Sequence, residues 1–173
     1  MLLLKKTVTV FSLLLLSGCG FQPIYGSGNN SVFRAEMREI AIAPIKNRIG
    51  QQLRNELERR ITPKGRAHVS RYVLTVKLTE SKQGLAVKKS EIATRANLIL
   101  RASYTVTRKS DGANITSGNS RMITSYNILT QTFATLMAEK DARKRGVREI
   151  SVDITSKVAA FFKLNRNKLA EAK

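Results

Sequence analysis

Apolar residues recur along this chain with two spacings, which separate candidate strands from candidate helices. Residues 94–108 alternate between apolar and polar side chains, a pattern typical of a strand with one buried face and one wet face. Residues 71–80 alternate in the same way, and residues 114–126 do so more weakly. We expect a turn near Gln83–Gly84 between the first two strands, and a turn at Asp111–Gly112 between the last two.

Two other segments have the helical spacing of three to four residues. Residues 49–61 carry one apolar stripe between charged side chains, and residues 130–164 carry a longer stripe. The stripe positions expected to face the core are Ile49, Leu53, Leu57 and Ile61 in the first helix, and Val147, Ile150, Ile154, Val158 and Phe161 in the second.

The stripe of the second helix also has an upstream part. Phe133, Leu136 and Met137 begin it, and it then passes through two lysines before Gly146. Glycine is a poor helix former, so Gly146 marks a weak point or a kink in the expected helix.

A short strand over residues 38–45 completes the set, with Pro44 indicating an edge position or the end of the strand. The order β-α-β-β-β-α predicts an α+β fold in which two helices pack on one face of a four-stranded sheet. The expected contact in the core joins Leu53, Leu57, Ile150, Ile154 and Val158 to Leu98, Leu100, Tyr104 and Val106.

The N-terminus has the pattern of an export signal. Two lysines precede an apolar run, Thr7–Leu16, that is too short to span a bilayer. Leu16–Cys19 (Leu-Ser-Gly-Cys) resembles the bacterial lipobox. Residues 1–18 are therefore expected to be a lipoprotein signal peptide, with Cys19, the only cysteine, acylated at its thiol and its freed amine. An ordinary cleaved secretory signal or a single-pass anchor is the alternative.

This interpretation also divides the chain. Residues 19–31, rich in glycine, asparagine and serine, form a lipidated tether, and residues 32–173 form a single domain. Lipid at Cys19 would hold that domain to a membrane, since each buried CH₂ group contributes about 0.8 kcal/mol. Gly20, rather than aspartate, resembles lipoproteins that are sorted to the outer membrane.

The charge indicates an anionic partner. The chain has 31 lysines and arginines against 12 acidic residues, and removal of residues 1–18 lowers the formal net charge from +19 to +17. A protein exported to a Gram-negative envelope rarely meets nucleic acid, and the abundant polyanion there is lipopolysaccharide. A role in solubility alone is the alternative.

The basic residues are densest in residues 82–109 and residues 139–149. A cluster suits a multiply charged anion better than an even distribution does. The residues predicted to contact lipopolysaccharide are Lys88, Lys89, Arg95, Arg101 and Arg148.

The sequence offers no constellation for catalysis. His68 is the only histidine, and it is expected in a solvated loop. No thiol remains after acylation, and no nucleophile elbow, P-loop or zinc helix is found. We expect no enzyme activity, no cofactor and no metal, although a Ser-Lys dyad stays open.

Residues 19–26 (Cys-Gly-Phe-Gln-Pro-Ile-Tyr-Gly) resemble the start of the mature chain in the LPS-assembly lipoprotein LptE family. The resemblance extends loosely over the first helix, the long strand pair and the final helix with its Leu136–Ala142 segment (Leu-Met-Ala-Glu-Lys-Asp-Ala). The chain differs from better-known members of that family in its short, Glu-poor C-terminus and in its high charge.

The resemblance implies an outer-membrane lipoprotein with its domain on the periplasmic side. Members of that family plug the LptD β-barrel, assist its folding and interact with lipopolysaccharide during delivery to the cell surface. The alternatives are a pilotin-like lipoprotein that escorts another outer-membrane channel, a basic periplasmic nucleic-acid-binding factor, and an envelope hydrolase.

Overall fold

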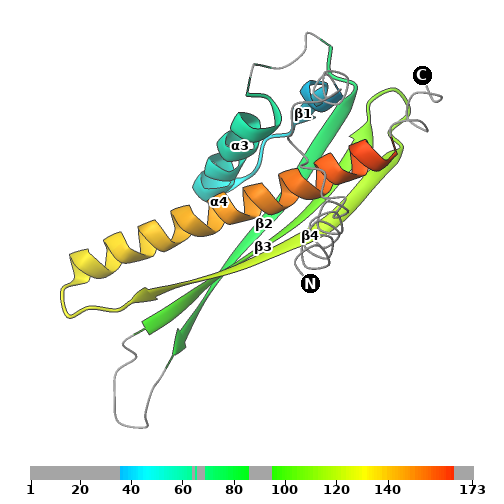
Figure 1. Cartoon of the computed structure of the whole chain (residues 1–173). Coiled ribbons are helices and arrows are strands. Elements are labelled where there is room, and N and C mark those ends of the chain that lie inside the picture. The colour runs from blue at the N-terminus through cyan, green and yellow to red at the C-terminus, as the bar shows by residue number, and fades with distance from the viewer. Residues whose placement is uncertain (1–35, 64, 66–68, 86–94, 166–173) are drawn as a thin grey trace, which may run out of the picture. The chain divides into compact units, whose positions relative to one another are not determined.

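The computed structural model describes residues 36–63, 65, 69–85 and 95–165 (Figure 1). The chain divides into two units, Met1–Asn30 and Ser31–Lys173, and every described residue belongs to the second. The elements of this unit are β1 (Ile40–Ile42), α3 (Asn47–Ile61), β2 (Tyr72–Leu85), β3 (Arg95–Arg108), β4 (Asn114–Asn127) and α4 (Thr132–Leu164). The predicted order is confirmed, and a helical turn over residues 36–38 precedes it.

The four strands form one mixed sheet in the order β1-β2-β3-β4. β1 pairs with β2 in parallel, so α3 is the crossover between them, as a parallel pair requires. β2, β3 and β4 are each 14 residues long and pair antiparallel. Gly112 has a φ of 70° in the predicted turn between β3 and β4, which favours glycine, and this turn is confirmed.

Both helices lie on one side of the sheet (Figure 1). α4 packs on β3 and β4, and α3 packs against α4 and β1. The predicted α+β fold with two helices on one sheet face is therefore confirmed.

The core lies between the helices and the sheet. All nine side chains predicted for this contact are buried, and eight of them, all except Tyr104, are fully enclosed. The stripe of α4 differs at one position, because Phe162 rather than Phe161 is fully buried. Phe162 lies four residues after Val158, and its ring meets the ring of Tyr72 edge-on with centroids 5.0 Å apart. A step of four therefore follows the helical period here better than the predicted step of three.

Two strand boundaries differ from the prediction. The first strand has three residues rather than eight, because Arg38 belongs to the preceding helical turn. The expected turn at Gln83–Gly84 is wrong, since both residues lie in β2 and pair with residues 97 and 96 of β3. Hydrogen bonding to β3 keeps this polar end of β2 extended, although its side chains lack a hydrophobic alternation.

Gly146 does not interrupt α4, which is helical from Thr132 to Leu164. A Cβ atom at Gly146 would lie only 2.8 Å from Cδ1 of Leu100 in β3. The glycine therefore lets helix and sheet approach closely.

The N-terminal part of α4 is not part of the core. Phe133, Leu136 and Met137 were expected to continue the buried stripe, but they are 74%, 58% and 45% exposed. The physical reason is length: a helix of 33 residues rises about 50 Å, whereas the 15 residues of α3 rise only about 22 Å. This end of α4 therefore extends beyond α3.

Candidate anion-binding site

The sheet has an inner face toward the helices and an open face on the other side. Because side chains alternate along a strand, the buried residues Leu100 and Ala102 flank Arg101, which projects from the open face. Lys77 of β2 and Arg121 of β4 project from the same face. We call Lys77, Arg101 and Arg121 the open-face patch. They line one shallow hollow of about 500 Å³ with Thr79, Ser103 and Asn119.

The sheet register sets the arrangement of this patch. Arg101 is paired with Thr79 on one side and with Arg121 on the other, so two guanidinium groups lie on directly opposed positions. Ser103 lies in the next row between Lys77 and Asn119. Like charges at opposed positions destabilise a sheet. The pairing therefore concentrates positive charge at a cost to stability.

No carboxylate neutralises this charge on the open face of the described strands. β2, β3 and β4 contain a single acidic residue, Glu80, and its side chain pairs with Arg143 of α4 on the inner face. The guanidinium group of Arg101 donates a long hydrogen bond of 3.5 Å from Nη1 to Ser81 Oγ. The open-face patch thus combines three cations with hydroxyl and amide groups, a set that suits phosphate or carboxylate groups.

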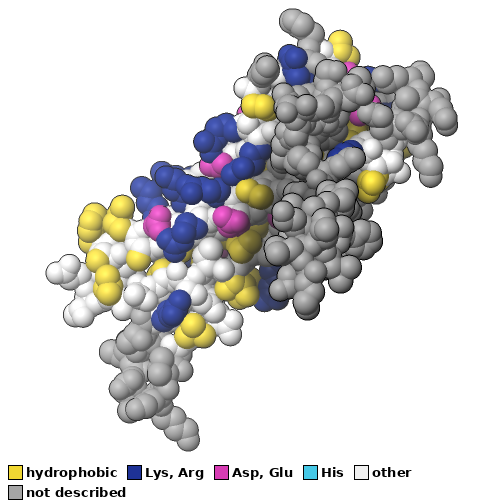
Figure 2. All heavy atoms as spheres, viewed as in Figure 1, with side chains coloured by type: hydrophobic (Ala, Val, Ile, Leu, Met, Phe, Trp, Pro, Cys, Tyr) yellow, Lys and Arg dark blue, Asp and Glu magenta, His cyan; other side chains and the backbone are white. Residues whose placement is uncertain are grey.

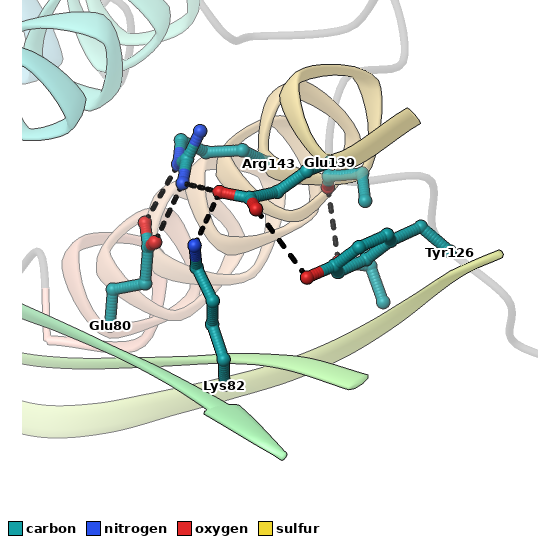
Figure 3. Close-up of polar contacts among 7 residues, drawn as sticks. Glu80, Lys82, Tyr126, Glu139 and Arg143 are labelled. Atoms are coloured by element: carbon teal, nitrogen blue, oxygen red, sulfur yellow. Dashed lines mark hydrogen bonds and ion pairs between the residues drawn. The ribbon is translucent and has the colours of Figure 1, made fainter. Parts of the chain in front are cut away.

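The inner face uses its charged residues differently (Figure 3). Arg143 of α4 donates two hydrogen bonds of 2.8 Å to the carboxylate of Glu80 and a third, of 2.6 Å, to Glu139. Lys82 Nζ lies 2.7 Å from Oε1 of Glu139, and the Tyr126 hydroxyl donates to Oε2 at 3.4 Å. These five residues form the inner-face network, which joins β2, β4 and α4.

The network shifts the titration of its members. Burial raises the pKa of Glu139, but hydrogen bonds from Lys82 and Arg143 outweigh burial and hold this pKa below its usual value. The hydrogen bonds to Glu80 are the largest cause of a raised pKa at Arg143. Arg143 and Lys82 are thus already paired and are poor candidates for binding an external anion.

The predicted contact residues do not form one site. Arg101 lies in the open-face patch, and Arg95 is on the same face, six residues or about 20 Å further along β3. Arg148 is exposed on α4, in the helical layer behind the sheet. Lys88, Lys89 and the acylation candidate Cys19 lie outside the described residues.

Sequence reasoning missed Lys77 and Arg121 as site residues. Both lie outside the densest basic segments: Arg121 is the single base of β4, and Lys77 lies five residues before Lys82 in β2. The signal that unites them is the strand register, which places β2 and β4 on the two sides of Arg101.

Within the described ranges, no helix is both long enough and apolar enough to cross a membrane. The same residues contain no group of three or more histidine, cysteine or acidic side chains able to hold a metal ion.

The fold is that of small bacterial lipoproteins of known structure. A chain described as a lipoprotein from Caulobacter crescentus CB15 matches with a TM-score of 0.67 and 18% identity, over 78% of this chain and 98% of that one. A minor lipoprotein from Acinetobacter baumannii matches with a TM-score of 0.59 and 19% identity, over 71% and 92% of the chains. Rare lipoprotein B from Shewanella oneidensis matches with a TM-score of 0.55 and 11% identity, over 74% and 98%.

The family is shown by the sequence itself. A family model described as "LptE: Lipopolysaccharide-assembly" matches residues 37–158, which is more than half of the chain. The chain belongs to the LptE family of lipoproteins, which is non-enzymatic and serves lipopolysaccharide assembly. Among curated proteins, none matches the sequence.

Proposed function

We propose that this chain is an outer-membrane lipoprotein that binds lipopolysaccharide through its open-face patch while it is seated in an LptD-type β-barrel. The observation that carries the proposal is the open face of the sheet, where Lys77, Arg101 and Arg121 line one hollow and the described strands place no carboxylate. Family membership supplies the context of lipopolysaccharide assembly.

The chemistry of the patch fits the phosphates of lipopolysaccharide. Arginine presents several donors in a planar fork that matches phosphate oxygens, and lysine adds a compact charge. Each charge-assisted hydrogen bond contributes about 1.5–3 kcal/mol. A ligand with several phosphates therefore gains from a rigid sheet that holds the three bases together.

The same face suits the lumen of a large barrel. The interior of a channel-forming outer-membrane barrel is polar, whereas its lipid-facing side is apolar. The open face of β2–β4 is mostly serine, threonine, asparagine and basic residues, so it can contact water and polar lumen side chains. This supports a plug-like placement with the helical layer turned to another part of the assembly.

Attachment to the membrane would come from acylated Cys19. The lipobox-like Leu16–Cys19 segment supports this arrangement. The tether of residues 19–31 would then set how far the domain can reach from the outer membrane.

Co-purification tests the proposal. The chain isolated from outer membranes in mild detergent is expected to carry an LptD-sized barrel protein and lipopolysaccharide. A variant in which Lys77, Arg101 and Arg121 are all reversed to glutamate should keep the barrel and lose most of the lipopolysaccharide. A secretin in place of that barrel would instead indicate the pilotin-like function.

Membrane attachment is tested separately with Cys19→Ala behind a conventional signal-peptidase site. That variant should be released into the periplasm as a folded domain when the barrel is not produced. Its retention in the membrane without a partner would overturn the assignment of Cys19 as the anchor.

A further inference from the structure

A groove of about 820 Å³ lies between α3 and the N-terminal half of α4, on the helical side of the sheet. Its apolar part is a ridge made by Phe133, Leu136 and Met137, which are largely exposed. Figure 2 views this side and shows apolar side chains gathered at the N-terminal end of α4, next to a band of lysines and arginines over α3 and α4. We call this feature the helical groove. Its volume is in the range that binding pockets occupy.

The helical groove also carries positive charge that is not neutralised. Arg48, Lys140 and Lys144 line it, and none of them forms an ion pair with another described residue. Its two carboxylates are already engaged, Glu56 with Arg59 and Glu80 with Arg143. The groove therefore favours an occupant that is both apolar and acidic.

The walls of the groove indicate a polypeptide rather than an acyl chain. The α3 side presents the amides of Asn47, Gln52 and Asn55, and an acyl chain would desolvate these groups without giving them hydrogen bonds. The apolar ridge has the helical spacing i, i+3, i+4, which is the spacing used when helices pack together. The same stripe of α4 continues to Val147, which is 2% exposed where α4 packs against α3.

We propose that the helical groove docks an acidic, amphipathic segment of a partner protein, with apolar side chains on the ridge and carboxylates at Arg48, Lys140 and Lys144. A second copy of this chain is a poor occupant. With 31 basic residues against 12 acidic ones, two copies repel each other. Docking at this groove is independent of what the open-face patch binds.

Photo-crosslinking in the producing cell tests the docking. A benzophenone amino acid replaces Leu136 in the full, lipidated chain, and the adduct is identified by mass spectrometry of its peptides. The expected adduct joins Leu136 to one protein segment that contains several acidic residues among apolar ones. The double variant Lys140→Glu/Lys144→Glu should reduce its yield roughly tenfold, because repulsion replaces attraction at the rim.

Two controls make the result specific. Val152 is also an exposed apolar residue of α4 but does not line the groove, so a benzophenone there should not capture the same segment. Arg148→Glu reverses an exposed base on the same helix outside the groove and should leave the Leu136 adduct unchanged. The proposal is overturned if Leu136 captures lipid only, a second copy of this chain, a segment without acidic residues, or nothing. It is also overturned if the double reversal leaves the yield unchanged.

Discussion

The two faces of the sheet carry similar charged residues and use them in opposite ways. On the inner face, Arg143 and Lys82 are held by Glu80 and Glu139, and the network joins the helix to the strands. On the open face, Arg101 and Arg121 are opposed without any carboxylate from the described strands. Leu100 and Arg101 are neighbours in sequence, yet Leu100 is fully buried in the core and Arg101 projects from the open face. The position of the bases relative to acids, rather than the local density of bases, therefore separates the two faces.

The largest effect on stability should come from the inner face. Leu100 is fully buried and contacts the helix at Gly146, so Leu100→Ala leaves a cavity where helix and sheet meet. We expect a loss of about 2–5 kcal/mol in the free energy of unfolding, measured by urea denaturation. Arg101→Ala, one residue along on the open face, should change stability by less than about 0.5 kcal/mol. Equal losses at the two positions would contradict the division between the faces.

A smaller loss is expected when the inner-face network is broken. Arg143→Met keeps the aliphatic stem but leaves Glu80 and Glu139 without the guanidinium that lies between them. Because both carboxylates are partly buried, the free energy of unfolding should fall by about 2 kcal/mol. Arg145→Met removes a base of the same helix whose partner, Asp141, is exposed, and it should cost only a few tenths of a kcal/mol.

Much of this division was predictable, but the pairing across strands was not. Alternation in residues 94–108 correctly assigned Leu100 inward and Arg101 outward, because the strand period of two is independent of the partners. Lys77 and Arg121 could not be joined to Arg101 from the sequence, since the register depends on backbone pairing. The exposure of Phe133 could not be predicted for a similar reason. Hydrophobic spacing shows which face of α4 is apolar, but it does not show how far along that face α3 extends.

Part of the pH dependence of stability should come from the inner face as well. The pKa of Glu139 is lower in the folded protein than its ordinary value of about 4.3, so the folded state favours the ionised carboxylate. The stabilisation is complete above that ordinary value and is lost as the pH falls through the folded pKa. Wild type should therefore lose stability on acidification below about pH 4.3, and Glu139→Gln should lose less over the same range. Parallel acid profiles of the two proteins would contradict this assignment.

The smallest expected effect is a gain in the stability of the folded protein. Arg121→Glu converts the opposed pair with Arg101 into opposite charges, which should stabilise the sheet by about 0.5 kcal/mol. Thermal unfolding of this variant should occur at or slightly above the wild-type temperature, with Arg121→Gln between the two. A marked loss of stability would mean that Arg121 has a structural partner.

The most direct test of the open-face patch is the affinity of the purified chain for lipopolysaccharide across a salt series. Arg101→Glu/Arg121→Glu should weaken binding about 100-fold at low salt and flatten its salt dependence, because two phosphate contacts are replaced by repulsion. Arg148→Glu, on the helical layer, should change the affinity less than about threefold. Equal losses in the two variants, or binding that ignores both salt and the double reversal, would contradict a binding site on the open face.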